Sequence, residues 1–126
     1  MGNKSFIDIN SQIPIFQQIV NETERQILVG ELRDGDFLIS VREFASVHTI
    51  NPNTVSKAYQ LLQTMGLVEA IRGKGLKVKK IEDKIAASRK ESILKERIFD
   101  LIQLSKALNI SKHDLIEIIK ANGEKK

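Results

Sequence analysis

The 126-residue sequence contains no cysteine, which excludes disulfides and thiolate metal sites. No apolar run approaches the roughly 20 residues that a membrane-spanning helix needs. The first ten residues, MGNKSFIDIN, lack the apolar core of a secretion signal. We therefore expect a cytoplasmic protein that consists of one modest domain, or of a small domain with an appendage.

Patterns of catalytic and metal-binding residues are also missing. The two histidines, His48 and His113, lie far apart and have no carboxylate partners at ligand spacing, which favours turn or surface positions for both. No Ser/His/Asp arrangement and no pair of carboxylates indicates a catalytic centre. The glycine-rich stretch RGKG does not open a helix, so it does not match a nucleotide-binding loop. We expect no enzyme activity and no cofactor.

Positive charge is concentrated in the middle of the chain. The net charge is +4 overall, and residues 40–80 carry seven basic and two acidic side chains, a local net charge of +5. Residues 1–39 carry three basic and six acidic side chains, a local net charge of −3. A local basic excess suits the phosphates of a nucleic acid, and the alternative is a basic surface that only keeps the protein in solution.

Helical periodicity and capping residues predict two helices in the first half of the chain. The first follows from PIFQQIVNETERQILVGEL, in which Pro14 suits the first helical position. The second opens at SVRE, where Ser40 and Glu43 form a capping box. Phe44 and Val47 are expected to face the core from this second helix.

A third helix and a hairpin follow. Asn51 is a favourable N-cap, Pro52 suits the first helical position, and Gly66 ends the helix. LVEAI and LKVKK are typical of two short strands joined by RGKG. Two helices joined by a tight turn and followed by a basic hairpin predict a winged helix-turn-helix, mainly α with a small β-hairpin. The inner side chains expected for the third helix are Val55, Ala58, Leu62 and Met65.

Short polar side chains gather at the start of the third helix, where a recognition helix meets base edges. The amide of Asn53 favours adenine, and Lys57 can meet a guanine. Arg42 can clamp a backbone phosphate, and the hairpin tip suits a wing that approaches the minor groove. The alternatives are a solvated helix face and an ordinary glycine-rich hairpin. The predicted DNA-binding residues are Ser40, Arg42, Asn53, Thr54, Ser56, Lys57, Arg72, Gly73 and Lys74. Tyr59 is expected beside Leu62, with a phosphate contact as the less favoured alternative.

The last third of the chain has a different pattern. A heptad-like seam steps by four, three, four and three through Leu94, Ile98, Leu101, Ser105 and Leu108. Ser111 with Asp114 caps a short final helix. Residues 79–92 are expected to join a DNA-binding domain, residues 1–80, to a helical dimerisation tail, residues 81–126. The alternative is a helical hairpin that only completes the core of a monomer. The predicted dimerisation residues are Leu94, Ile98, Leu101, Ile102, Leu108, Leu115, Ile118 and Ile119.

Residues 12–80 resemble the DNA-binding domain of GntR-type bacterial transcription regulators. The resemblance is carried by the ordered run SVRE…NPNTVSKAY…GLVE…RGKG. The short tail is similar to that of the YtrA subfamily, whose members lack the larger effector-binding domains of other GntR regulators. The resemblance implies a homodimeric repressor that binds an inverted-repeat operator of a transporter operon or of its own operon. The alternative is a winged-helix module that binds proteins and has given up DNA.

Two positions depart from the family pattern. Ile39 stands where proline is usual, and Thr49 stands where glycine is common. Thr49 is β-branched, and it must make a turn that glycine makes freely. Neither departure removes a contact residue, so we expect altered local geometry and retained DNA binding. The sequence identifies no small-molecule effector.

Overall fold

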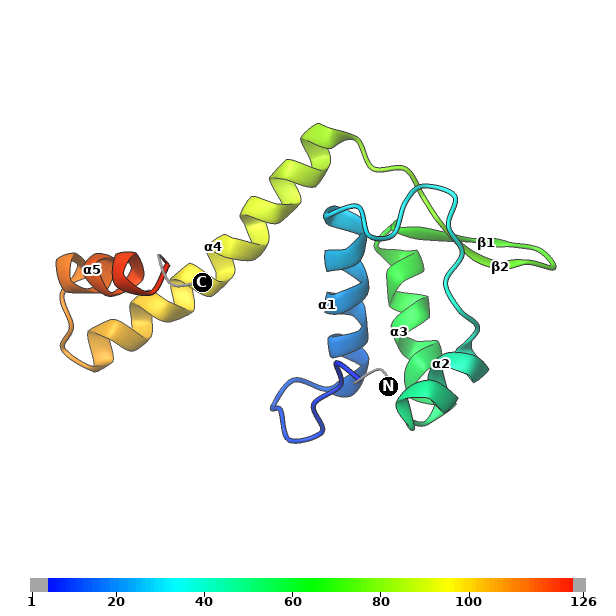
Figure 1. Ribbon diagram of the computed structural model, residues 1–126, viewed down its shortest axis with the longest axis horizontal. Coiled ribbons are helices and arrows are strands. Elements are labelled where there is room, and N and C mark those ends of the chain that lie inside the picture. Colours follow the sequence, from blue (N-terminus) through cyan, green and yellow to red (C-terminus); the bar gives the residue numbers. More distant parts are fainter. Residues whose placement is uncertain (1–4, 124–126) are drawn as a thin grey trace. The chain divides into compact units, whose positions relative to one another are not determined.

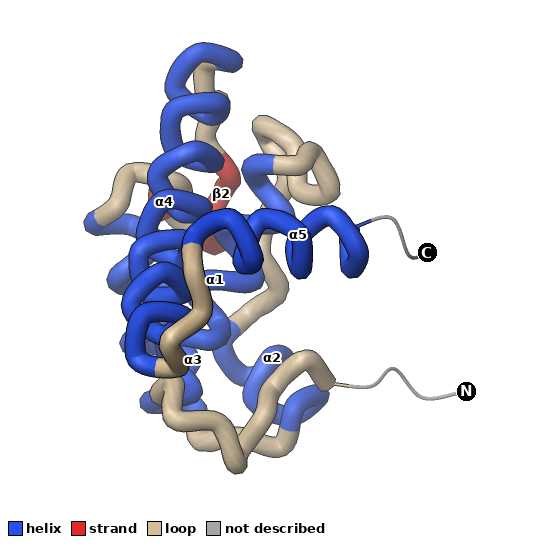
Figure 2. The backbone as a smooth tube through the Cα atoms, turned by 90° about the vertical axis from the view of Figure 1, so that its left-hand side faces the viewer, coloured by secondary structure: helices blue, strands red, loops and turns tan. Residues whose placement is uncertain are grey.

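The computed structural model describes residues 5–123, which form five helices and one antiparallel hairpin (Figure 1). Figure 2 shows how far helix predominates over strand in this part of the chain. The predicted fold class, mainly α with a small β-hairpin, is confirmed. The elements are α1 (Ile15–Leu28), α2 (Val41–His48), α3 (Pro52–Thr64), β1 (Val68–Ile71), β2 (Gly75–Val78), α4 (Asp83–Ala107) and α5 (Lys112–Gly123).

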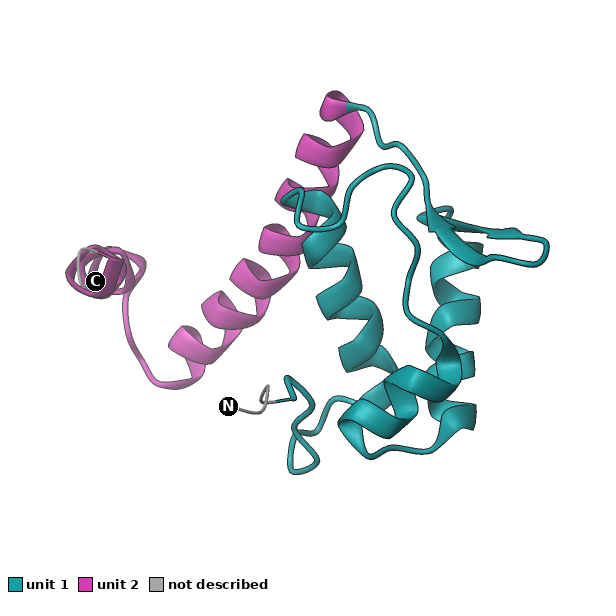
Figure 3. Cartoon of the chain, turned by 45° about the vertical axis from the view of Figure 1, so that its right-hand side comes forward, with its two compact units in different colours: residues 1–82 teal, residues 83–126 magenta. Residues whose placement is uncertain are grey.

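The chain divides into two compact units, Met1–Glu82 and Asp83–Lys126 (Figure 3). The first unit holds α1 to α3 and the hairpin, and the second holds α4 and α5. The joint is shorter than the predicted residues 79–92, because α4 already begins at Asp83. Asp83 lies in the first turn, where a carboxylate is favourable, and the following residues include no proline or glycine that would delay the helix. No described helix is both long and apolar enough to cross a bilayer.

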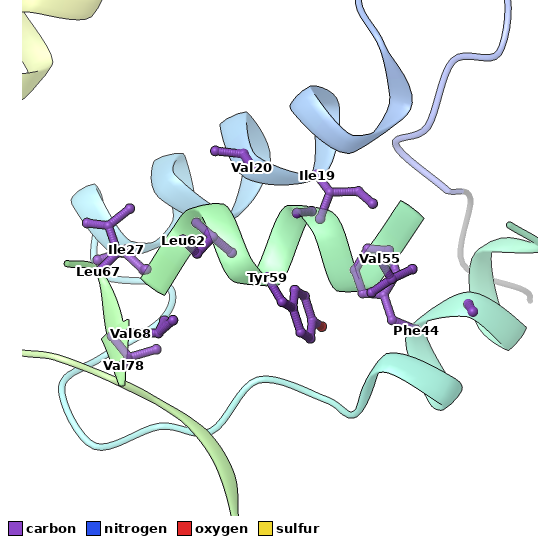
Figure 4. Close-up of a cluster of buried hydrophobic side chains, with 12 residues drawn as sticks. Ile19, Val20, Ile27, Phe44, Val55, Tyr59, Leu62, Leu67, Val68 and Val78 are labelled. Atoms are coloured by element: carbon purple, nitrogen blue, oxygen red, sulfur yellow. The ribbon is translucent and has the colours of Figure 1, made fainter. Parts of the chain in front are cut away.

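The core of the first unit lies between α1, α3 and the hairpin (Figure 4). Ile19 from α1, Val55 and Leu62 from α3, and Val78 from β2 have no measurable exposure to solvent. Burying an aliphatic side chain of this size contributes roughly 1.5–3 kcal/mol. These contacts hold α3 on α1 by one side, so the opposite side of α3 faces solvent.

Three details of the helices differ from the sequence-based expectations. Pro14 is the N-cap of α1 and not its first residue. Val47 is 58% exposed, because Phe44 and Ala45 take the inward positions of the short α2. Met65 is 36% exposed, since α3 ends at Thr64 and the chain reverses, which brings the next apolar residue, Leu67, into the core instead.

The hairpin that follows α3 is held from two sides. β1 pairs with β2 in antiparallel register from Val68 opposite Val78 to Ile71 opposite Gly75. On the outer edge of β2, Phe37 forms an isolated antiparallel bridge with Lys77. The segment that leads into α2 is thereby tied to the hairpin.

The turn between α2 and α3 requires a left-handed residue. Thr49 occupies this position with φ 56° and ψ 54°, and its N–H donates to the carbonyl of Ala45. The N–H of Ile50 also donates to that carbonyl, at 3.0 Å. The strain expected at Thr49 is therefore present, because a β-branched residue is disfavoured in this region.

We expect Thr49→Gly to stabilise the protein by about 1 kcal/mol, since glycine adopts the left-handed conformation without steric cost. Thermal unfolding followed by circular dichroism should show a midpoint roughly 4–8 °C higher. Ser46→Gly, inside the exposed side of α2, is the matched control and should lower stability by about 0.5 kcal/mol. An unchanged or lower midpoint for Thr49→Gly would contradict the assignment of strain to this turn.

Candidate nucleic-acid interface

The exposed side of α3 begins at a well-defined cap. The Asn51 side chain accepts a hydrogen bond from the N–H of Asn53 at 2.8 Å, as predicted for this N-cap. Asn53 and Ser56 are exposed on the first turns, whereas Thr54 is half-buried. The first-turn N–H groups of a helix also favour an anion such as a phosphate. Asn53 and Ser56 are thus available to a nucleic acid, and Thr54 is less accessible.

Lys57 is exposed but has a partner within the protein. Its Nζ lies 4.0 Å from the centre of the Phe16 ring, on α1. A cation over an aromatic face is attracted by the ring quadrupole, and at an exposed site the contact contributes about 0.5–1 kcal/mol. The ammonium group is therefore drawn towards the border between α3 and α1.

The start of α2 presents Ser40 and Arg42. The Ser40 hydroxyl oxygen accepts a hydrogen bond from the N–H of Glu43 at 3.1 Å, which caps the helix. Arg42 is exposed on the first turn of α2, and no carboxylate of residues 5–123 pairs with it. A guanidinium that is not engaged within the protein is available for a bidentate contact with a phosphate.

The tip of the hairpin is a tight basic turn. The N–H of Lys74 donates to the carbonyl of Ile71 at 2.9 Å, and Gly73 adopts φ 79°. Arg72 and Lys74 are both exposed on either side of this glycine. A side chain at position 73 would be strained by the positive φ, which explains why glycine stands between the two basic residues.

An open groove connects the three parts of the predicted site. It is lined by Ser40 at the start of α2, Ser56 and Gln60 on α3, and Lys74 on the hairpin. Three of the predicted residues, Ser40, Ser56 and Lys74, therefore line one groove, although they come from separate parts of the sequence. Gln60 was not among the predicted contacts, although its position seven residues after Asn53 was a signal, since that spacing returns to the same side of a helix.

Tyr59 is buried, and its hydroxyl donates to the carbonyl of Ile39 at 2.8 Å. Burial raises the pKa of Tyr59, and the charge of Glu43 adds to this shift. The phenol therefore ties α3 to the segment that precedes α2. This bond uses the hydroxyl proton that a phosphate contact would need, so Tyr59 is a structural residue of the interface.

His48 closes a small cluster at the far end of α2. Its ring centroid lies 4.2 Å from that of Phe44 and 5.2 Å from that of Phe6. Its Nδ1 is 2.6 Å from the Ser5 hydroxyl oxygen. Burial in this cluster lowers the pKa of His48 below its usual 6.5, because the charged imidazolium loses solvation there.

This shift predicts a loss of stability in acid. The unfolded chain binds a proton at His48 more readily than the folded chain does, so stability falls as the pH drops through about 6.5. Urea unfolding at about pH 7.5 and about pH 5.5 measures the difference, and we expect His48→Gln to reduce it. The exposed His113→Gln is the control. An equal pH dependence in wild type and His48→Gln would contradict the assignment.

The second unit carries a large apolar surface. The predicted dimerisation residues differ in exposure: Leu115 is buried within the unit, where α5 meets α4, and Ile102 is half-buried. Leu115 therefore stabilises the helical pair of one chain and is not accessible to a partner. Ser105 is also buried, and its hydroxyl donates to the carbonyl of Ile102 at 2.8 Å. The exposed members of the predicted set are Leu94, Ile98, Leu101, Leu108, Ile118 and Ile119.

The described residues include no group of three or more His, Cys, Asp or Glu side chains that could hold a metal ion. A helix-turn-helix, a recognition helix with an exposed polar side and a basic hairpin beside it define the winged helix-turn-helix class of DNA-binding domain. The sequence comparisons assign the chain within this class. A family model described as bacterial regulatory proteins of the gntR family matches residues 15–78, and the chain belongs to that family.

Several relatives extend this assignment. The chain is 38% identical over 96 residues to the HTH-type transcriptional repressor YtrA of Bacillus subtilis, covering 76% of this chain and 74% of the relative. It is 32% identical to the uncharacterized HTH-type transcriptional regulator YhcF of the same species, covering 90% and 93%. A GntR family transcriptional regulator from Listeria monocytogenes has a similar structure, with a TM-score of 0.77, 28% identity and coverage of 90% and 98%.

The predicted membership of the GntR family and the resemblance to its YtrA subfamily are thereby confirmed. The protein is a YtrA-like transcription regulator with a GntR-type DNA-binding domain, and it is not an enzyme. Its partner is DNA, so the alternative of a winged-helix module that has given up DNA loses its support.

Proposed function

We propose that the protein is a homodimeric repressor that binds an inverted-repeat operator, controls a transporter operon or its own operon, and acts in the cytoplasm. Residues 1–80 form the DNA-binding domain, and residues 81–126 form the dimerisation segment. The name of the relative YtrA, a transcriptional repressor, supports the direction of regulation. The predicted contact residues on α2, α3 and the hairpin are the groups that meet DNA.

The observation that carries the dimer is the apolar surface of the second unit. Leu94 and Ile98 on α4 are 61% and 49% exposed, and Leu108, directly after α4, is 60% exposed. Monomers rarely leave contiguous apolar patches of this kind in water. The steps of four and three from Leu94 through Ile98 to Leu101 place these three residues on one side of α4, which suits a symmetrical helix pair. A two-fold axis through that pair gives two recognition helices related by the symmetry of an inverted repeat.

Two measurements test the proposal. Sedimentation at micromolar concentration should give twice the chain mass of 14.2 kDa, and a particle of 14.2 kDa would refute the dimer. Selection of bound sequences from a random DNA pool should return two half-sites with inverted symmetry, about one helical turn or a multiple of it apart. A single unpaired half-site would contradict the symmetrical reading. A reporter gene placed behind the selected operator should be expressed less when the protein is present.

A further inference from the structure

The exposed side of α3 has a definite order around the helix axis. Each residue advances by about 100°, so Gln60 lies only about 20° from Asn53 and about 10 Å further along the axis. Ser56 lies to one side of this line and Lys57 to the other. All four side chains are exposed. Asn53 and Gln60 therefore form the centre line of the surface that α3 presents outward.

The Gln60 side chain has no hydrogen-bond partner among residues 5–123. It lines the groove beside Ser56, and the Thr64 hydroxyl donates to its backbone carbonyl at 3.1 Å. Among the described residues no hydrogen bond to its side-chain amide is present. In a major groove, a glutamine amide offers a donor and an acceptor that match N6 and N7 of adenine.

Lys57 is held away from this centre line. Its ammonium group lies over Phe16 of α1, at the edge of the exposed side of α3. Groups at the edge of a recognition helix meet the sugar–phosphate walls of the groove, whereas groups on its centre line meet base edges. Lys57 thus lies towards a phosphate and not towards the guanine that the sequence-based hypothesis gave it.

We propose that Gln60 is a specificity-determining residue that reads an adenine in each half-site beside the base read by Asn53, whereas Lys57, positioned by Phe16, binds a phosphate. This inference rests on the proposed function, because it requires α3 to enter a major groove. The centre line of α3 carries two amides and no cation. We therefore expect α3 to prefer A·T base pairs to G·C pairs. The expected DNA target is a half-site with adenines under the middle of the helix.

The test uses the full-length protein and the operator selected from the random pool. Wild type, Gln60→Ala and the matched control Gln103→Ala, which truncates an exposed glutamine on α4 outside the groove, are titrated on operator and on random duplex. Operators with 7-deazaadenine, which lacks the N7 acceptor, are measured for each adenine. We expect Gln60→Ala to lower operator affinity roughly tenfold or more. We also expect the affinity of Gln60→Ala for random DNA to equal that of wild type. At one adenine of the operator, replacement by 7-deazaadenine should weaken binding of wild type and leave binding of Gln60→Ala unchanged. Gln103→Ala should behave as wild type.

Unchanged base preferences in Gln60→Ala, or an equal loss on operator and random DNA, would overturn the role of Gln60. A wild-type protein that selects no sequence from the pool would instead refute the proposed function itself. The two failures are thus distinguishable. Thermal unfolding of Gln60→Ala, an exposed substitution, verifies that the fold is retained.

The role of Phe16 and Lys57 is tested in parallel. Lys57→Met should lower the affinity for operator and for random DNA by the same factor. It should also lower the slope of log affinity against log salt concentration by about one per subunit. Phe16→Leu should also lower the affinity for both DNAs. Phe16→Tyr, which keeps an aromatic face, should bind both DNAs as wild type does. A change of base preference in Lys57→Met, or a loss in Phe16→Tyr as large as in Phe16→Leu, would overturn the positioning role.

Discussion

Replacing Ile98 with glutamate is expected to dissociate the dimer and to lower operator affinity by roughly 10²–10⁴-fold. Ile98 is half-exposed in the single chain, so a carboxylate there remains hydrated in a monomer. In the proposed dimer the same carboxylate would be buried opposite its symmetry mate, at a cost of several kcal/mol. Once the chains separate, the second half-site no longer binds as an intramolecular event, and the gain from tethering two domains is lost.

Gln103→Glu is the matched control for this variant. Gln103 is exposed on α4 and lies about 180° around the helix from Leu94, so the same charge is added on the opposite side. Sedimentation and operator titration of both variants give the result, with circular dichroism to verify that helix content is retained. Dimers of undiminished stability in Ile98→Glu would show that the apolar surface of α4 has another use.

The parts of the fold that the sequence predicts well depend on neighbours in the chain. Ser40 caps α2, Asn51 caps α3, and Gly66 with φ 80° ends the turn after α3, because each signal involves residues within one helical turn. The hairpin is likewise predicted by RGKG between two alternating runs. Even the strained turn at Thr49 follows from the residue type that stands there.

Contacts between distant segments are not predictable in the same way. The Lys57 ammonium meets Phe16, which is 41 positions earlier, and Tyr59 donates to the carbonyl of Ile39, across 20 positions. Periodicity also leaves helix rotation uncertain by a residue, so Leu115 was assigned to a dimer interface although it packs within its own unit. The residue types in the sequence were therefore enough to propose the candidate site. The direction in which Lys57 points could not be predicted, because it depends on how α1 packs against α3.

Two single substitutions at the DNA-binding surface, Arg42→Ala and Asn53→Ala, are expected to have different effects on affinity and on specificity. Arg42→Ala should weaken binding to operator and to random DNA alike, because a phosphate contact carries no sequence information. Each charged hydrogen-bonded contact contributes about 1.5–3 kcal/mol, and a dimer loses it twice. The expected loss is therefore roughly 3–6 kcal/mol, or a factor of about 10² to 10⁴, with a smaller salt slope.

Asn53→Ala should act differently, because an amide that reads a base contributes to binding only on the correct sequence. We expect operator affinity to fall by about 1–3 kcal/mol for each half-site and random-DNA affinity to stay almost unchanged. Titrations on both DNAs at several salt concentrations separate the two variants, and Arg42→Lys, which keeps the charge but loses the bidentate geometry, should lie between wild type and Arg42→Ala. An equal loss on operator and random DNA for Asn53→Ala would exclude a base-reading role, and the first turn of α3 would then act only on the phosphate backbone.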